Sequence, residues 1–340
     1  MHRIADCAVD AMLRSTAETV VWGHIAADVA PVLRIRSGQT VRIDTVSHQG
    51  LIKQDPIAFF GESGVRAEQV LQDAVDIFHR VKRREGAGVH VLTGPIYVEG
   101  AQAGDMLEVR IRDIEFRVPY GVNSTGRGSG VLPDLLEKPA LRTIALDLDR
   151  GVALFAPEIE VPLSPFMGIM AVAPPNGERV STKPPGHWGG NMDLKQLTTG
   201  ATLYLPVFNE GALFYTGDGH ATQGDGEVDG TAIEISLTPT LQFLVHKGAG
   251  KRMRWPRAED AAHYCSMGMD SDLDTALKNA VQETVDFLRD RAGLSVADAY
   301  ALASLSVDFR IGEAVNNTKM VYGMIPKNLF RKKTEYWYAA

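Results

Sequence analysis

The glycine-rich segment Gly217-Asp-Gly-His-Ala-Thr-Gln-Gly-Asp-Gly-Glu227 gathers three acids and one histidine within a short stretch of chain. A second segment of similar character, Gly189-Gly-Asn-Met-Asp193, precedes it. Glycine loses more backbone entropy on folding than other residues, and carboxylates held close together repel one another. We therefore expect these segments to fold around a cation or a polar reaction centre that holds the acids together.

Asp193, Asp218 and His220 are the candidate metal ligands, because carboxylate oxygens and imidazole nitrogens bind hard or borderline divalent ions. His220 follows Asp218 by two residues, so both side chains project to the same side if the segment is extended. The same spacing also fits turn and capping residues, and a metal motif of established spacing such as HExxH is absent. Spacing alone leaves both interpretations open.

Three further histidines are candidates for the same site. His90 precedes an apolar pair of residues and a Gly-Pro turn, so it can enter the same cavity or serve as a hydrogen-bonded structural histidine. His187 lies on the stretch that leads into Gly189–Asp193, where it can contact a substrate or order a ligand. His48 has the weakest case of the three.

A nucleophilic side chain explains the sequence less well. The chain has no Gly-x-Ser-x-Gly segment before an expected helix, which disfavours an α/β-hydrolase. Cys265 follows His263 by two residues, but that spacing is no evidence of a working thiol and imidazole pair. The glycine pattern fits neither a dinucleotide-binding nor a P-loop motif.

Length and composition are those of a globular chain that can bury a sizeable core, with 340 residues of which 45% are hydrophobic. A formal net charge of -7 and a pI of 5.7 give no polyanion-binding signal, so we expect no nucleic-acid partner. A secretory pattern and a long apolar run are both lacking, which predicts a cytoplasmic protein without membrane association. Cys7 and Cys265 are expected to be unpaired, reduced thiols.

Most of the chain has the pattern of β-strands, in which apolar and polar residues alternate between Gly, Pro, Asn and Asp breaks. In Met106–Ile114, Leu107 and Val109 share one face while Glu108 and Arg110 share the other, which is typical of a half-buried antiparallel strand. The expected strands are Thr19–Ile25, Thr40–Thr45, Met106–Ile114, Thr143–Leu148, Thr202–Phe208, Ala212–Tyr215, Thr231–Leu237 and Leu241–His246.

Helical periodicity is confined to three places. One helix is expected over Val65–Lys82. A second begins after the capping-box pattern at Ser271–Asp274 and ends near Gly293, and a third follows Ser295 and runs to about Leu305. A closing strand is expected near Ser306–Ile311. A β-rich body followed by a helical hairpin predicts a mainly β or α+β fold, built as a sandwich or a barrel.

We expect one compact catalytic unit in three parts. Residues 1–165 form a β-rich part with one helix, residues 166–265 form a β part that carries both glycine-rich motifs, and residues 266–340 form the helical hairpin and the closing strand. The Pro/Gly-rich stretch 173–190 and the motif Gly217–Glu227 are expected to be loops.

Three motifs, in this order along the chain, resemble those of the acetamidase/formamidase family. They are Gly94-Pro-Ile-Tyr-Val-Glu-Gly-Ala101 with the following Gly104-Asp-Met-Leu-Glu-Val109, then Gly189-Gly-Asn-Met-Asp193, and then Gly217-Asp-Gly-His-Ala-Thr-Gln-Gly-Asp-Gly-Glu227. Trp22, Pro31–Val41, Leu203–Val207 and Val307–Arg310 are similar as well. The resemblance covers nearly the whole chain, and three ordered motifs are more specific than any one of them.

This resemblance implies a mainly β (α+β) fold, with a jelly-roll-like β-sandwich, additional β and α/β elements, and a homo-oligomeric assembly. It implies hydrolysis of a short amide to a carboxylate and ammonia, and some family members are zinc-dependent and open small lactams. The polar motif residues carried over by position are His90, Glu99, Asn191, Asp193, Asp218, His220, Gln223, Asp225 and Glu227.

The roles of these residues are our hypothesis. Asp193, Asp218 and His220 hold a divalent ion, zinc, which makes a water molecule nucleophilic near neutral pH. Glu227 is the base that passes a proton to the departing nitrogen. Further expected site residues are Asp225 and His90 as catalytic groups, Asn191, Gln223 and His187 as substrate contacts, and Glu99 as a residue that orders a ligand.

The predicted function is hydrolysis of the C–N bond of a short linear amide, of the formamide or acetamide type, by a metal-activated water. The expected partner is a small amide substrate. Two alternatives stay open, namely hydrolysis of a small lactam by the same site and a non-catalytic β-sandwich that binds a ligand.

Overall fold

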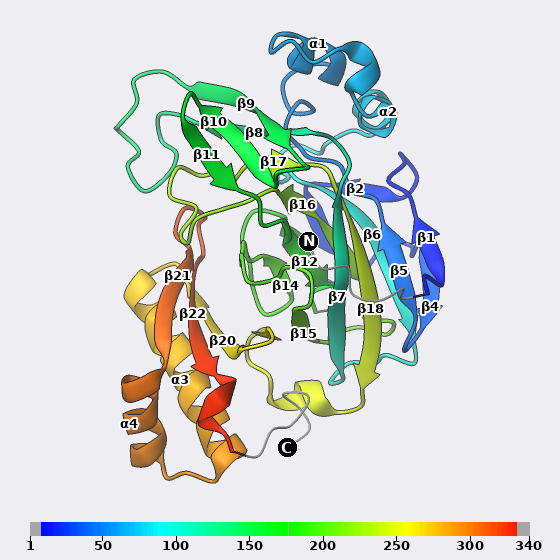
Figure 1. Ribbon diagram of the computed structural model, residues 1–340. Helices are drawn as coiled ribbons and strands as arrows, with labels where there is room; N and C mark the ends of the chain where they lie inside the picture. Colours follow the sequence, from blue (N-terminus) through cyan, green and yellow to red (C-terminus); the bar gives the residue numbers. More distant parts are fainter. Residues whose placement is uncertain (1–7, 176, 332–340) are drawn as a thin grey trace.

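Two large β-sheets form the body of the protein and share one hydrophobic core (Figure 1). The computed structural model describes residues 8–175 and 177–331. Buried side chains of one sheet, such as Leu107 and Phe243, join those of the other, such as Phe214 and Ile235. The mainly β fold expected from the alternation of apolar residues is confirmed.

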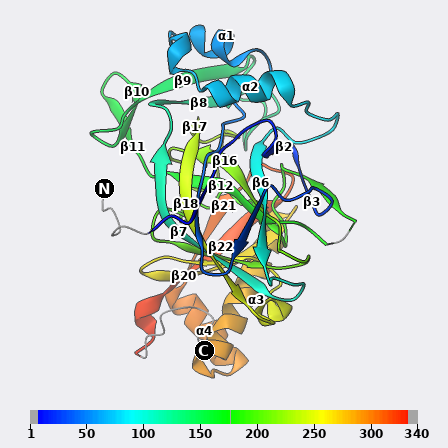
Figure 2. The same cartoon turned by 90° about the vertical axis from the view of Figure 1, so that its right-hand side faces the viewer.

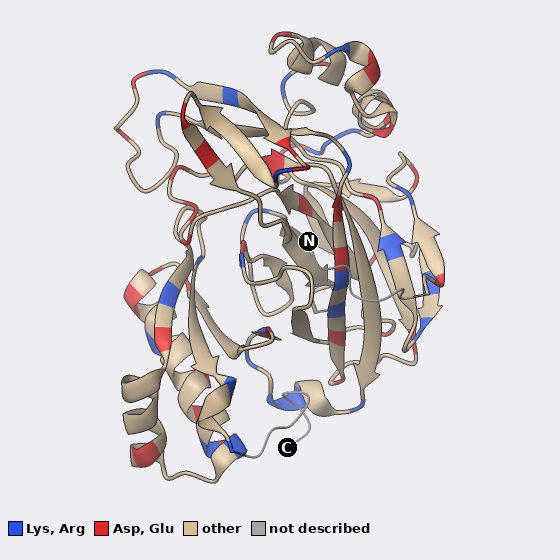
Figure 3. Ribbon diagram, viewed as in Figure 1, with Lys and Arg blue, Asp and Glu red and all other residues tan. Residues whose placement is uncertain are grey.

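The first sheet has nine strands in the order β1-β5-β18-β7-β15-β19-β20-β22-β21. Along β7, Leu107 and Val109 are fully buried, as predicted, and charged residues recur along the same strand (Figure 3). Glu108 and Arg110 alternate with the two buried residues and so share the other face. Glu108 on that face is also buried, where Arg110 and His246 pair with it. The strands are β1 (Ala11–Leu13), β5 (Thr40–Ile43), β7 (Met106–Phe116), β15 (Thr202–Pro206), β18 (Leu237–His246), β19 (Arg257–Glu259), β20 (His263–Asp270), β21 (Asp308–Glu313) and β22 (Lys319–Pro326).

The second sheet has eleven strands. Its main path is β11-β10-β9-β8-β17-β16-β12-β14, and β6 joins it by pairing with β16, β2 and β4. The strands are β2 (Val20–Trp22), β4 (Leu33–Arg36), β6 (Val91–Glu99), β8 (Tyr120–Thr125), β9 (Ala140–Asp147), β10 (Val152–Ala156), β11 (Ile159–Pro162), β12 (Phe166–Val172), β14 (Gly189–Asn191), β16 (Phe214–His220) and β17 (Glu234–Ile235). A separate pair consists of β3 (His24–Ala26) and β13 (Arg179–Ser181).

Helices lie at two opposite ends of the molecule (Figure 2). At one end are α1 (Pro56–Gly61) and α2 (Gln72–Arg80), and at the other are α3 (Leu273–Ala292) and α4 (Val296–Ser306). The predicted C-terminal hairpin is confirmed, because Asp272 caps α3, Gly293 ends it in a left-handed conformation, and Ser295 caps α4. Short 3-10 turns are η1 (Ala67–Gln69), η2 (Ala249–Arg252) and η3 (Lys327–Leu329). None of the helices in the described part of the chain combines the length and apolarity needed to cross a bilayer.

Some local expectations are wrong. The helix expected over Val65–Lys82 is shorter, because Val70 and Leu71 have extended backbones and only α2 continues as a helix. The closing strand is present as β21, but β22 was not predicted, and it pairs with both β20 and β21. The stretch 173–190 is interrupted by β13. Cys265 is a buried free thiol, as expected, whereas Cys7 lies outside the described residues.

Candidate metal centre

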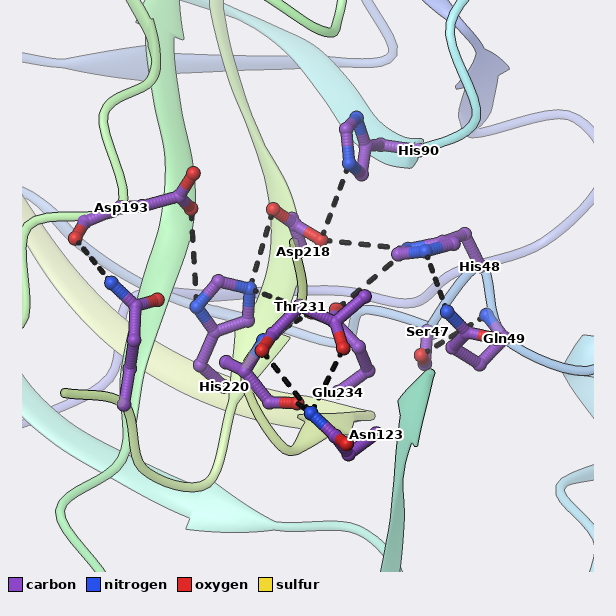
Figure 4. A network of polar contacts seen from close by, with 12 residues as sticks. Ser47, His48, Gln49, His90, Asn123, Asp193, Asp218, His220, Thr231 and Glu234 are labelled. Carbon is purple, nitrogen blue, oxygen red and sulfur yellow. Dashed lines mark hydrogen bonds and ion pairs between the residues drawn. The ribbon is translucent and has the colours of Figure 1, made fainter. Parts of the chain in front are cut away.

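Strand β16 carries two of the predicted ligands into the middle of the second sheet. Asp218 and His220 lie two residues apart in this strand and point into the same cluster of side chains, as predicted (Figure 4). The strand pairs with β12, β6 and β17, and all of its residues are buried. The expectation that Gly217–Glu227 is a loop is therefore wrong for its first four residues, which belong to β16.

The glycines of β16 allow close contact between strands. A Cβ on Gly217 would lie 2.4 Å from the carbonyl oxygen of Val91, and one on Gly219 would lie 2.6 Å from that of Ile235. Both distances are shorter than a van der Waals contact. These two positions therefore need glycine so that neighbouring strands can approach closely. The sequence alone does not distinguish such glycines from glycines that make a loop flexible.

Three acids of the cluster have a strained backbone. Asp193, Asp218 and Glu227 have φ angles of 47°, 58° and 46°, in the left-handed region that non-glycine residues rarely adopt. Each such residue costs about 1–3 kcal/mol and persists only where the surrounding structure holds it in place. Strain at three acids of one cluster is typical of a functional site.

Two histidines face one oxygen of Asp218. Oδ1 of Asp218 lies 3.5 Å from Nδ1 of His48 and 3.7 Å from Nε2 of His90. The other ring nitrogens have partners of their own, since Nδ1 of His90 lies 3.0 Å from Oγ1 of Thr182 and Nε2 of His48 lies 3.2 Å from Nε2 of Gln49. These outer contacts orient both rings so that one nitrogen of each faces Asp218.

His220 lies on the other side of Asp218, between three acids. Its Nε2 is 3.5 Å from Oδ2 of Asp218 and 3.4 Å from Oε1 of Glu234. Its Nδ1 is 3.9 Å from Oδ1 of Asp193. The three ligands predicted from the sequence are thus neighbours, with Asp193 and Asp218 facing different nitrogens of the same ring.

Three overlapping groups in the described part of the chain have the composition of a metal site. In each group the potential ligand atoms lie within 4.8 Å of one another. The groups are His48, His90 and Asp218; Asp218, His220 and Glu234; and Asp193, His220 and Glu227. Buried atoms of this cluster without a hydrogen bond are Nδ1 of His48, Oδ1 of Asp218, Nδ1 of His220, Oε2 of Glu234 and both carboxylate oxygens of Asp193. Because buried polar atoms are normally hydrogen-bonded, this donor set fits a bound cation.

Burial disfavours charge on two of the acids. It raises the pKa of Asp193 well above its ordinary value, and the nearby Glu227 raises it further. Burial likewise raises the pKa of Glu227 well above the ordinary value for a glutamic acid. Burial therefore favours the protonated form of Glu227 more than that of an ordinary glutamate, a shift that is common among groups that transfer protons in active sites.

The pKa values of Asp218 and His90 are lowered, whereas that of His220 is raised. Burial opposes ionisation of Asp218, but the neighbouring His90 and His220 outweigh it and hold the pKa of Asp218 well below its usual range. Burial would lower the pKa of His220, but Glu234 and Asp218 raise it well above the ordinary value. Burial lowers the pKa of His90 to about 4, so that ring is neutral at pH 7.

Gly168 of β12 has no side chain, and the cluster occupies the space that a side chain at this position would fill. A Cβ at this position would lie 2.6 Å from Oδ1 of Asp193, 2.6 Å from Oδ2 of Asp218 and 2.9 Å from Cε1 of His220. The missing side chain lets two carboxylates and the ring converge over the strand.

The sequence matches a known protein family over most of its length. The model of the acetamidase/formamidase family matches residues 65–178 and 176–332. This chain belongs to the acetamidase/formamidase family.

Similar proteins carry names of the same family. The acetamidase of Mycolicibacterium smegmatis is 31% identical over 42% of this chain and 50% of its own length, and the chain spans about half the length of the curated relatives it matches. Two solved structures are similar over 94% of this chain. They are a predicted acetamidase/formamidase from Thermoanaerobacter tengcongensis (28% identity, TM-score 0.79, 96% of that chain) and an acetamidase from Bacillus halodurans (30% identity, TM-score 0.78, 98% of that chain).

Three further predicted site residues of this family member belong to the same two glycine-rich motifs. Oδ1 of Asn191 in β14 is buried without a hydrogen bond, and Nε2 of Gln223 donates to the backbone oxygen of Asp193, 3.0 Å away. Asp225 accepts from the hydroxyl of Tyr322 at 2.7 Å and pairs with Lys195 at 3.0 Å. The roles predicted for these residues stay predictions.

Two predicted residues lie outside the cluster. The ring of His187 stacks on Trp255 with 4.2 Å between ring centres, and its Nδ1 lies 2.6 Å from the backbone oxygen of Arg254. Glu99 is exposed and ends β6, whereas His90 directly precedes that strand. Eight residues of β6 separate Glu99 from His90, so Glu99 lies at the far end of the strand from that histidine, which disfavours its predicted role in ordering a ligand.

Sequence reasoning missed Glu234 and gave His48 too little weight. Glu234 lies in β17 between buried apolar neighbours. An acid flanked by apolar residues in an expected strand is a signal that the sequence does contain. His48 follows β5 in a fully buried segment. Only the pairing of distant strands shows that it faces Asp218.

Proposed function

We propose that this family member hydrolyses the C–N bond of an amide to a carboxylate and ammonia at the cluster around Asp218. The observation that carries the proposal is the buried convergence of His48, His90 and Asp218, in which the facing atoms of His48 and Asp218 have no hydrogen bond. Relatives named acetamidase and formamidase support an amide as the substrate.

The ligands proposed for a divalent ion are His48, His90 and Asp218. Two imidazoles and one carboxylate, with a further position open, form a common ligand set of catalytic zinc. Neutral histidine is the form that binds metal, and the low pKa of His90 supplies it. Thr182 fixes the orientation of His90 from behind. This chemistry favours zinc over calcium or magnesium, which prefer oxygen ligands.

The set predicted from the sequence, Asp193, Asp218 and His220, is the alternative. His220 is less suited to bind metal, because its raised pKa favours a protonated ring between Asp218 and Glu234. The two sets share only Asp218, so that His48 belongs to the first set alone and Asp193 to the second alone. Elemental analysis of the His48→Ala and Asp193→Ala variants therefore separates them, with exposed His79→Ala as the matched control.

We expect His48→Ala to lose the ion while Asp193→Ala and His79→Ala keep it. Loss of the ion from Asp193→Ala alone would favour the alternative set. Wild-type protein should contain about one divalent ion per chain or more. Metal-free protein that still releases ammonia from amides would refute a metal-dependent reaction.

A divalent ion held at Asp218 would lower the pKa of water and polarise the amide carbonyl. Glu227 is the proton carrier, since its raised pKa matches this task. It takes a proton from water and gives it to the nitrogen as the C–N bond breaks, so that ammonia leaves instead of an amide anion. Asn191 is proposed to orient the substrate through its buried side-chain amide.

The test of the overall reaction is ammonia release by purified protein from formamide, acetamide, longer amides and small lactams. Release from a linear amide supports the proposal, and release from lactams alone would favour the alternative substrate class. Absence of turnover with every compound would favour a β-sandwich that binds a ligand without catalysis. Homo-oligomerisation stays a prediction, which light scattering of the purified protein tests.

A further inference from the structure

A cavity of about 470 Å³ adjoins the candidate metal centre at Glu227. Glu227 lines this cavity and also belongs to the ligand group with Asp193 and His220. It is 7% exposed, while Asp193 and His220 are 1% exposed, so the cavity meets the buried cluster at Glu227. Another cavity, of about 530 Å³ beside α3, contains no residue of the cluster and is lined largely by charged side chains.

The walls of the cavity next to Glu227 are mainly apolar. Ile144 of β9, Phe155 of β10 and Val161 of β11 line it, together with Ile233, which directly precedes β17. These residues come from four separate segments of the second sheet and its connections, so the tertiary fold creates the apolar surface. Its polar lining includes Glu227, the proposed proton carrier, together with Gln223, Asp225 and Asp229.

The ring of Phe155, which forms part of the cavity wall, is held in place by Arg142 before any ligand binds. The guanidinium of Arg142 lies 4.3 Å from the centre of the Phe155 ring, and Nη1 of Arg142 donates to the backbone oxygen of Phe155 at 3.3 Å. A cation over the face of an aromatic ring is attracted to it. A ring fixed in this way presents a preformed apolar surface to a ligand.

We propose that this cavity binds the acyl group of the substrate, and that the preferred substrates are amides with a large apolar acyl group, such as an aryl-substituted or long alkyl amide. This inference rests on the amide hydrolysis proposed above. Pockets of about 300–1,000 Å³ bury ligands of drug-like size. A formyl or acetyl group has at most two carbons, and it would leave most of the cavity and its apolar walls in contact with water.

The first test is the rate constant kcat/KM of the wild-type protein for a series of amides from formamide through acetamide, butanamide and hexanamide to phenylacetamide. Each buried methylene is expected to raise kcat/KM about fourfold until the cavity is full. Values that fall beyond acetamide would overturn the acyl-site inference but leave amide hydrolysis intact. Absence of turnover with every amide would instead refute the reaction on which the inference rests.

The second test compares Phe155→Ala with Leu154→Ala. Both side chains are on β10 and similarly exposed, at 39% and 45%, but of the two only Phe155 lines the cavity. Phe155→Ala is expected to lower kcat/KM for phenylacetamide roughly tenfold and to leave acetamide nearly unchanged. Leu154→Ala should change neither. Equal losses on both substrates, with unchanged melting temperature, would overturn the inference.

Discussion

Replacing Gly168 with alanine adds one methyl group at the floor of the candidate metal centre. The new Cβ would lie 2.6 Å from a carboxylate oxygen of Asp193 and 2.6 Å from one of Asp218. Carbon contacts are comfortable at about 3.5 Å, so each oxygen has to retreat by about 0.9 Å. Both acids are almost fully buried, which leaves little room for that movement.

A displacement of about 1 Å in a catalytic constellation costs roughly a hundredfold in rate, or about 2.7 kcal/mol. We therefore expect Gly168→Ala to bind zinc more weakly and to release ammonia from amides roughly a hundredfold more slowly. Alanine suits a strand at least as well as glycine, and the crowded atoms belong to side chains and not to the backbone. We therefore expect the metal-free variant to keep its fold, with a lowered melting temperature.

The measurements are calorimetric titration of metal-free protein with zinc, initial rates of ammonia release, and melting temperature in the presence of a chelator. Gly61→Ala is the matched control, because a Cβ on Gly61 meets nothing within 4 Å and this residue ends α1, outside the cluster. If Gly168→Ala matched the wild-type protein in both metal affinity and rate, the reasoning that Gly168 shapes the site would be refuted.

Three further predictions address proton transfer, the thiol and pH. Glu227→Gln should keep the bound metal but lower turnover about a hundredfold or more, and unchanged turnover would remove Glu227 as the proton carrier. Cys265→Ala should still release ammonia from amides, because burial raises the pKa of this fully buried thiol and disfavours the reactive thiolate. Loss of that activity would revive a thiol mechanism. Burial raises the pKa of Glu313 to about 7, so the folded protein keeps a proton that the unfolded chain loses from about pH 4.5 upward. The unfolding free energy should therefore fall by up to about 3 kcal/mol between pH 4.5 and 7 through this group. Denaturant unfolding of metal-free wild-type protein and Glu313→Gln across this range checks it, and parallel pH curves would contradict it.

Features with a local cause could be predicted from the sequence. The alternation along β7 follows from one face of a strand being buried, and the ends of α3 and α4 follow from capping residues that act within a few positions. The spacing of Asp218 and His220 was enough to place both on one side of an extended segment. Family membership was visible in three motifs because each is a short, contiguous stretch.

Pairing between distant strands decided the rest. His48 reaches Asp218 from a segment 170 positions earlier in the chain, and Glu234 reaches His220 because β17 pairs with β16. Gly168 creates space for acids on two other segments, and no property of its own neighbourhood in the sequence indicates this. The sequence by itself determined the types of group that do the chemistry. The tertiary structure decided which of them share a cation site, because ligand geometry depends on distances across the sheet.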